Sequence, residues 1–241
     1  MLSGRQIEAG GRPLRRLLAE AAEFLLPQHC LVCGRFGAAL HDRCLARLPA
    51  AEPPRCLRCW RPGAGTWCER CAAGGPDAPA FDGLRAPFEF EGAARRAIIE
   101  AKFRGVTALL PPLARAAAMT VPEEWDVGLV VPVPLAPRRR RLRGYNQAEL
   151  AAREIARALG LPIELKWLRR VRETPPQAGL TAAARSTNLR EAFAAVPQPS
   201  ARNVLVVDDV TTTGATFEAV ARALRSAGVH RVYAVALARE D

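Results

Sequence analysis

Several features are missing from this 241-residue sequence, and each absence excludes a class of protein. No apolar run approaches the ~18 consecutive residues of a membrane-spanning helix, so no membrane span is predicted. Charged side chains interrupt residues 1–27 too often for the apolar core of a secretory signal. No Gly-Lys-Ser/Thr sequence occurs, which excludes a nucleotide-binding P-loop. A cytoplasmic location is therefore the default expectation.

Lysine is scarce, with only Lys102 and Lys166, yet the net charge is +11 because arginine is abundant. Such a charge favours polyanionic partners, for example phosphate esters or nucleic acid. An arginine- and alanine-rich composition would also follow from a GC-rich genome, so both explanations stay open. The length suggests one or two domains.

Residues 1–27 are predicted to form an amphipathic N-terminal helix that ends before Pro27. This interpretation favours docking onto the protein itself over binding to a membrane surface. The apolar face consists of Leu14, Leu17, Leu18, Ala21 and Leu25.

Cysteine is absent outside residues 30–71, and within that segment it occurs in a regular pattern. Seven cysteines and one histidine form four pairs, each separated by two residues. Eight such ligands are the number that two closed tetrahedral zinc sites would use. Disulfides are the competing interpretation, but an odd cysteine count without an export signal favours zinc. The ligand pairs are Cys30 and Cys33, His41 and Cys44, Cys56 and Cys59, and Cys68 and Cys71.

Residues 28–75 are predicted to form a separate zinc-binding module, because they contain little hydrophobic material for a core of their own. Bound metal would supply the missing stability, so up to two zinc ions are expected in a structural rather than a catalytic role. Spacing leaves open whether the two sites are sequential or interleaved. The Gly- and Pro-rich segment 74–79 is the expected linker to a second domain at 80–241.

Strands and helices are predicted to alternate in this second domain. A hairpin is expected within 81–90, helices over 92–105, 109–119, 146–159 and 214–227, and strands over 129–133, 163–171, 204–207 and 231–237. This order predicts an α/β fold with a parallel sheet and helices on both faces. Ligands of such sheets bind outside the carboxyl ends of the strands.

A polar loop follows the strand at 204–207. Two adjacent carboxylates come first, and small hydroxyl residues then lead into a helix. Free backbone N–H groups and hydroxyls at a helix start would hold a phosphate. The carboxylates would face ribose hydroxyls and a magnesium ion instead. The residues are Asp208, Asp209, Thr211, Thr212, Thr213, Gly214, Ala215 and Thr216.

This loop resembles the binding motif for 5-phosphoribosyl-1-pyrophosphate (PRPP) of type I phosphoribosyltransferases. The resemblance implies that Asp208 and Asp209 address the ribose hydroxyls and magnesium, while residues 211–216 hold the 5-phosphate. It also implies a type I phosphoribosyltransferase-like fold for the second domain.

A second polar segment follows the strand at 129–133. A rigid turn that presents arginines would suit pyrophosphate, although a solvated basic run or a nucleic-acid patch remains an alternative. The expected pyrophosphate loop contains Val133, Pro134, Leu135, Arg138 and Arg143, with further arginines at 139–141.

The combined motifs resemble the ComF family over about residues 24–239. They are Pro-Val-Pro-Leu at 132–135, Arg-Gly-Tyr-Asn-Gln at 143–147, Thr-Pro-Pro-Gln at 174–177 and the loop at 208–216. The resemblance implies a double zinc ribbon before the phosphoribosyltransferase domain, and a link to natural competence through uptake and handling of single-stranded DNA. His41 departs from the cysteine usual in the family but remains a zinc ligand.

Two functions follow from the resemblance. The first is a competence-type protein that binds PRPP and magnesium, with single-stranded DNA and a competence helicase or DNA-processing protein as partners. The second is an active PRPP-dependent phosphoribosyltransferase of nucleotide metabolism with an unidentified acceptor, in which 172–188 would be a lid carrying Gln177 and Arg185. No general base stands out, and Thr212 replaces an Asp that contacts the base in some purine enzymes. Trp60, Trp67 and Tyr145 are the candidates for base stacking.

Overall fold

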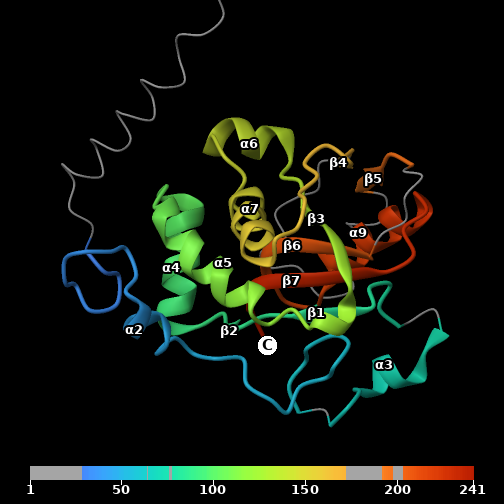
Figure 1. The fold of residues 1–241 in the computed structure, drawn as a ribbon, viewed down its shortest axis with the longest axis horizontal. Coiled ribbons are helices and arrows are strands. Elements are labelled where there is room, and N and C mark those ends of the chain that lie inside the picture. Colours follow the sequence, from blue (N-terminus) through green and yellow to red (C-terminus); the bar gives the residue numbers. More distant parts are fainter. Residues whose placement is uncertain (1–28, 64, 76–77, 172–191, 198–202) are drawn as a thin grey trace, which may run out of the picture.

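The computed structural model describes residues 29–63, 65–75, 78–171, 192–197 and 203–241 (Figure 1). The helix predicted within 1–27 and the predicted lid residues Gln177 and Arg185 lie outside these ranges. In the described part of the chain, no helix has the length and apolar character needed to cross a bilayer.

A parallel sheet forms the centre of the C-terminal part. Its strand order is β1 (Gly83–Arg85), β7 (Val232–Arg239), β6 (Asn203–Thr211) and β3 (Val127–Pro132). A short strand, β2 (Phe88–Glu89), also pairs with β7. Every one of these pairings is parallel. The expected parallel sheet is therefore confirmed.

The hairpin predicted within 81–90 is wrong. β1 and β2 both run parallel to β7, so they are successive segments along one edge rather than two strands that reverse. Pro87 lies between them and has no N–H to donate to a sheet partner. Its carbonyl instead accepts a hydrogen bond from the N–H of Ala51, 2.8 Å away.

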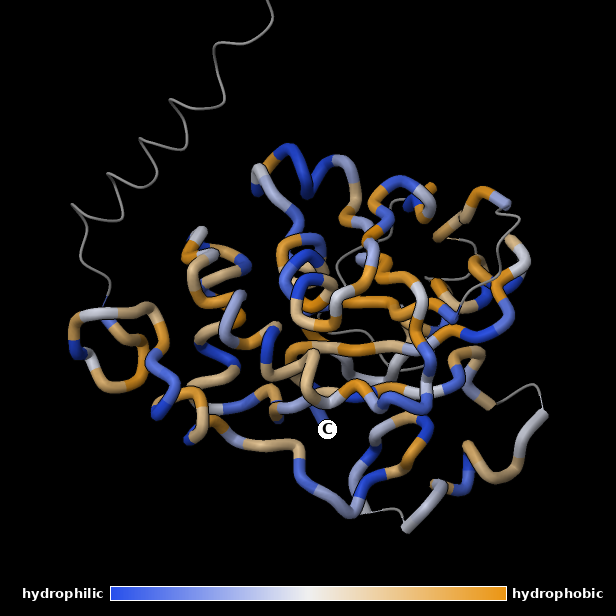
Figure 2. The backbone as a smooth tube through the Cα atoms, viewed as in Figure 1, coloured by the Kyte–Doolittle hydropathy of each residue, from blue (hydrophilic) through white to orange (hydrophobic). Residues whose placement is uncertain are grey.

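Helices cover both faces of the sheet, as predicted. Leu205 and Val207 of β6 pack with α4 (Gly92–Phe103), α5 (Leu110–Ala118) and α7 (Gln147–Leu159). The alternate residues of β6 face the other side, where they pack with α9 (Ala215–Ser226). This alternation is the period-two pattern of a strand buried on both faces. Figure 2 shows mostly hydrophobic residues along the central strands, and both hydrophobic and hydrophilic residues along the helices around them.

The prediction of a sheet strand over 163–171 is wrong. The strand there is β4 (Leu168–Arg170), and it pairs antiparallel with β5 (Phe193–Ala195) in a separate two-stranded sheet. Only Ile163 bridges to the main sheet, opposite Val130. The Glu164 carboxylate accepts the Lys166 N–H at 2.7 Å, and such a local bond competes with strand pairing.

The arginine-rich segment after β3 forms a helix, α6 (Pro137–Arg143), where a rigid turn was predicted. Pro137 starts it in a position where no N–H is needed, and Gly144 ends it with φ of 82°. The other short helices among the described residues are α2 (Asp42–Leu45), α3 (Glu69–Ala73), η2 (Thr107–Leu109) and η3 (Glu123–Trp125).

Candidate functional site

The eight predicted zinc ligands form two separate groups. Within each group, the four ligand atoms all lie within 4.8 Å of one another. The groups are sequential, which settles the order that spacing left open. The first group is Cys30, Cys33, His41 and Cys44, and the second group is Cys56, Cys59, Cys68 and Cys71.

His41 fits the first group in its detailed geometry. Its Nδ1 lies 3.4 Å from the Cys33 sulfur, and its Nε2 lies 3.2 Å from the Phe36 carbonyl oxygen. A histidine that ligates a metal usually donates its other ring N–H to such an acceptor, which fixes the ring orientation. With His41 in place of a fourth cysteine, the first group still offers four donor atoms, the number that a tetrahedral zinc site uses.

One buried thiol in each group lies in surroundings that favour thiolate, the form that binds metal. Burial instead raises the pKa of Cys44, Cys59 and Cys71. Burial raises the pKa of Cys30, but backbone N–H groups of Cys33 and His41 outweigh it and lower the pKa to about 6. Cys56 follows the same pattern: burial raises its pKa, and the backbone N–H groups of Cys59 and Cys68 outweigh this effect and lower the pKa to about 6. The Cys68 N–H donates to the Cys56 sulfur at 3.3 Å. Both groups can thus hold a zinc ion.

A cavity of about 620 Å³ lies at the carboxyl ends of β3 and β6. It combines two carboxylates on one side with basic and apolar side chains from α4, α6 and the segment after β3. The lining residues that matter here are Lys102, Phe103, Val133, Pro134, Leu135, Arg139, Leu142, Arg143, Asp208, Asp209 and Thr216.

The two carboxylates of the cavity, Asp208 and Asp209, lie in different surroundings. Asp209 is 3% exposed, and its Oδ1 accepts the N–H of Val210 at 2.9 Å. Its buried Oδ2 accepts no well-aligned hydrogen bond from the described residues, although the Lys102 ammonium lies 2.8 Å away as an ion-pair partner. Burial, and then the adjacent Asp209 charge, raise the pKa of Asp208. Ionisation of both neighbouring carboxylates is therefore costly, and the Lys102 ammonium is the described cation that lies closest to the pair.

Lys102 is a site residue that the sequence interpretation missed. It belongs to the last turn of α4, more than 100 residues before the aspartates, and its motif context gives no hint of the contact. The sequence feature that could have drawn attention to Lys102 is its rarity, because it is one of two lysines in an arginine-rich chain.

The predicted phosphate loop is divided between strand, turn and helix. Thr211 is the last residue of β6, and its carbonyl accepts the Glu240 N–H at 2.8 Å. The Thr213 hydroxyl accepts the Ala215 N–H at 3.3 Å, and Gly214 stands before α9 with φ of 82°. A side chain on Gly214 would be strained in this left-handed conformation. Among the predicted loop residues, Asp208, Asp209 and Thr216 line the cavity.

The predicted pyrophosphate loop reaches the same cavity. Val133, Pro134, Leu135 and Arg143 line it, whereas Arg139 takes the place expected for Arg138. This exchange follows from the helical conformation of α6, which turns neighbouring arginines to different sides.

Asn146 holds this loop to the next helix. Its side-chain amide donates to the Val133 carbonyl at 3.0 Å, and its carbonyl oxygen accepts the Ala148 N–H at 3.2 Å. The second bond caps α7. The position of the loop is thus set by the start of a packed helix.

The aromatic side chains proposed for stacking have mixed surroundings. The Trp60 ring lies under the Arg85 guanidinium at 4.6 Å, and its N–H donates to Ala86. The Tyr145 hydroxyl donates to the Ala101 carbonyl. Trp67 is 48% exposed. Phe103, which was not predicted, lies at the cavity and is 69% exposed.

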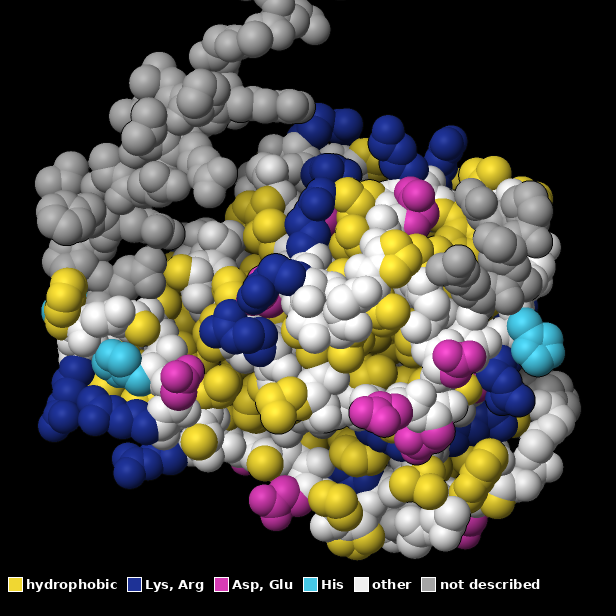
Figure 3. Space-filling view, in the orientation of Figure 1, with side chains coloured by type: hydrophobic (Ala, Val, Ile, Leu, Met, Phe, Trp, Pro, Cys, Tyr) yellow, Lys and Arg dark blue, Asp and Glu magenta, His cyan; other side chains and the backbone are white. Residues whose placement is uncertain are grey.

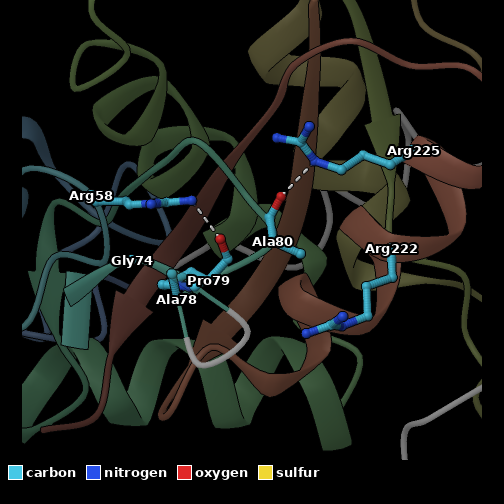
Figure 4. Close-up of a pocket in the computed structure, with 8 residues that line it drawn as sticks. Arg58, Gly74, Ala78, Pro79, Ala80, Arg222 and Arg225 are labelled. Atoms are coloured by element: carbon cyan, nitrogen blue, oxygen red, sulfur yellow. Dashed lines mark hydrogen bonds between the residues drawn. The ribbon is translucent and has the colours of Figure 1, made fainter. Parts of the chain in front are cut away.

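A second hollow of about 380 Å³ contains three arginines, shown in Figure 4. Arg58 donates to the Pro79 carbonyl at 2.6 Å, and Arg225 donates to the Ala80 carbonyl at 2.8 Å. Arg222 pairs with Glu218 at 2.6 Å. Each of these arginines therefore already has an acceptor within the protein.

Basic side chains also gather outside the cavities. Figure 3 shows Lys and Arg side chains over α6 and a further group near α2. In α6, Arg138, Arg140 and Arg141 are exposed, and only Arg140 has a described ion-pair partner, Glu149 at 3.5 Å. This surface lies next to the cavity, since Arg139 and Arg143 of the same helix line it.

Known proteins are similar to part of the chain. Residues 146–241 match the phosphoribosyl transferase domain family. Competence protein F of Haemophilus influenzae is 39% identical over 113 residues, which cover 46% of this chain and 49% of that protein. DNA utilization protein YhgH of Salmonella typhi is 36% identical over 110 residues, which cover 46% and 48%. The chain thus spans about half the length of these relatives, and over the matched residues the predicted resemblance to the ComF family is confirmed.

A solved structure is also similar in part. It is glutamine PRPP amidotransferase from B. subtilis, complexed with ADP and GMP, with 24% sequence identity and a TM-score of 0.36. The similarity covers 52% of this chain and 25% of that chain. So low a score adds nothing to the functional interpretation.

Proposed function

We propose that the cavity at β3 and β6 binds PRPP together with a magnesium ion. The similarity to competence protein F and the match to the phosphoribosyl transferase domain family support this proposal. The observation that carries this proposal is the charge arrangement of the cavity. Two carboxylates at the end of β6 share one cavity with arginines of α6. PRPP has ribose hydroxyls and a pyrophosphate at adjacent carbons, so it needs both kinds of partner within a short distance.

Different residues of the cavity would contact different parts of PRPP. Asp208 and Asp209 would accept hydrogen bonds from the ribose hydroxyls, and they offer the oxygen donors that magnesium prefers. Arg139 and Arg143 would neutralise the pyrophosphate with charge-assisted hydrogen bonds. The backbone N–H groups at the start of α9 would hold the 5-phosphate. Bound magnesium would neutralise charge on the pyrophosphate leaving group.

Calorimetric titration with PRPP and Mg²⁺ tests this proposal. Wild-type protein should bind, and an Asp208→Asn/Asp209→Asn variant should lose binding by about 100-fold or more, since two charge-assisted contacts of about 1.5–3 kcal/mol each are removed. An Arg222→Gln variant in the second hollow is the matched control and should bind like wild type. Absence of binding by the wild type would contradict the proposal.

The protein's biological role is proposed to be DNA uptake and utilization. The names of the relatives, competence protein F and DNA utilization protein YhgH, support this role. The exposed arginines of α6 suit single-stranded DNA, whose binding should then weaken as salt rises. Binding of labelled single strands at increasing salt measures this dependence, and an affinity that salt leaves unchanged would contradict the role of the arginines.

Catalytic transfer is the second candidate function. The reaction would break the bond between C1 of PRPP and pyrophosphate, which leaves with the electron pair, and would form a bond from C1 to an acceptor that loses a proton. Among the described cavity residues, Asp208 and Asp209 are the only carboxylates, and histidine is absent. The half-buried Asp208, with its raised pKa, favours this candidate because it could take the proton. Pyrophosphate release on addition of free bases or single-stranded DNA tests it, and no release with any acceptor would reject it.

A further inference from the structure

Lys102 occupies the position where a cation would meet the carboxylate pair. Its ammonium lies 2.8 Å from Oδ2 of Asp209, an oxygen that is buried and accepts no aligned hydrogen bond in the described part of the chain. The Lys102 side chain is 27% exposed, so it reaches this oxygen across the open cavity rather than through the core.

The backbone of Lys102 is held firmly in place. α4 buries Ala97, Ile98 and Ala101 against the sheet and its covering helices. The Tyr145 hydroxyl, from the segment that follows α6, donates to the Ala101 carbonyl. The lysine is therefore presented by a packed helix, while its long side chain can still move within the cavity.

We propose that Lys102 is a built-in counter-ion that keeps free divalent metal out of the site and admits it only together with PRPP. This inference rests on the proposed function of the cavity. A metal ion that arrives alone must displace the ammonium from Asp209 and leave it in the cavity without an acceptor. A metal that arrives with PRPP brings phosphate oxygens, to which the ammonium can move.

The local charges support this order of binding. With Lys102 in place, the described carboxylate pair and the ammonium carry less negative charge than two carboxylates alone, and Arg139 and Arg143 on the facing helix add further positive charge. Such a cavity attracts a polyanion and disfavours a bare cation.

Substitution of Lys102 tests the inference with Mn²⁺, a divalent ion that prefers oxygen ligands and is readily followed by paramagnetic resonance. In zinc-loaded protein, Lys102→Met should bind Mn²⁺ alone at least about tenfold more tightly than wild type, because one close positive charge has been removed. Lys102→Arg keeps the charge and should behave like wild type. Adding Asp209→Asn to Lys102→Met should abolish the new metal binding.

Equal Mn²⁺ affinity for wild type and Lys102→Met would overturn the inference. Lys102→Gln provides the same test with a polar side chain if the methionine variant does not fold, and a gain that persists after Asp209→Asn would also overturn it. Binding of PRPP with Mn²⁺ to the wild type is measured in parallel. If the wild type does not bind PRPP with Mn²⁺, the proposed function is rejected. If it binds PRPP but Lys102→Met has the same Mn²⁺ affinity as wild type, only the counter-ion role of Lys102 is rejected.

Discussion

The first and second cysteine groups have the same paired spacing, yet the rest of the molecule holds them in different ways. The first group packs through Leu40 and Leu48 against the core of α4 and α5. Among the described side chains, Arg96 gives it an exposed hydrogen bond to the Leu31 carbonyl at 3.2 Å, and just after Leu48 the Pro49 carbonyl accepts the Glu89 N–H of β2 at 2.9 Å. Phe36, within its loop, is 66% exposed. This group is attached mainly by apolar contact.

The second group is attached by buried arginines that join it to the sheet. Arg239 of β7 donates to the Cys59 carbonyl at 2.9 Å, and Arg85 of β1 donates to the Leu57 carbonyl at 2.7 Å. Arg55, 3% exposed, lies just before the second group and pairs with Glu89 of β2 and with Asp241, each at 2.7 Å. Side chains of three strands, β1, β2 and β7, therefore bond to the second group or to Arg55 beside it.

The difference teaches that equal metal chemistry does not mean equal coupling to the domain. Buried arginines lose water and need acceptors, and the turns around the second group supply these acceptors only when they are folded. Loss of metal from the second group should therefore disturb the sheet that carries the cavity. Loss of metal from the first group should remain local.

Removal of ligands from each group should give the largest effect. Cys56→Ser/Cys71→Ser should abolish cooperative folding, because structural zinc contributes about 10–16 kcal/mol in small zinc modules, more than a domain's usual margin of stability. Cys30→Ser/Cys44→Ser should lose one zinc yet keep a cooperative transition. Thermal unfolding by circular dichroism, with metal content measured in parallel, checks both. Equal loss of structure in the two variants would contradict the comparison.

Substitution of Arg55 should give the next largest effect. Arg55→Met removes a buried guanidinium and should lower the free energy of unfolding by about 2–3 kcal/mol; the value stays below that of a fully buried pair because water can reach Glu89 and Asp241. Arg96→Met is the matched change at the first group and should cost less than about 0.5 kcal/mol. Urea unfolding of both variants measures the difference, which would vanish if the two groups were attached alike.

Exchange of the single histidine ligand should have a smaller effect. His41→Cys keeps four donors and should retain zinc in the first group, whereas His41→Ala should lose it. The cysteine variant also loses the bond from the ring to the Phe36 carbonyl, so release of zinc to a chelator should be about 10-fold faster or more. Zinc retained fully by His41→Ala would show that the histidine is not a ligand.

The smallest effect is expected at the exposed aromatic residue of the first group. Phe36→Ser should change the free energy of unfolding by less than about 0.5 kcal/mol, because the ring is mostly in solvent and packs edge-on with His29 alone among the described rings. Urea unfolding again provides the measurement. A loss above 1 kcal/mol, on the order of a buried side chain, would mean that the first group is attached more firmly than its contacts indicate.

Much of the site could be predicted because its residues are close in sequence. The paired ligands and the segment 208–216 carry their chemistry in short motifs, and strand β6 and helix α9 around that segment follow from apolar periodicity. The edge of the sheet was harder to predict. Residues 81–90 were expected to reverse, and residues 163–171 were expected to join the sheet, because short apolar runs do not reveal which partner they pair with.

The sequence by itself determined the eight candidate metal ligands, the α/β class of the C-terminal part and the polar loop after a buried strand, since each depends on spacing and periodicity within a short stretch of chain. Only the tertiary structure decided that the two metal groups are sequential, that Arg139 rather than Arg138 lines the cavity, and that Lys102 meets Asp209. These contacts join residues that are far apart in the chain or that differ by one position around a helix. They depend on how packed elements orient their side chains, which no local pattern records.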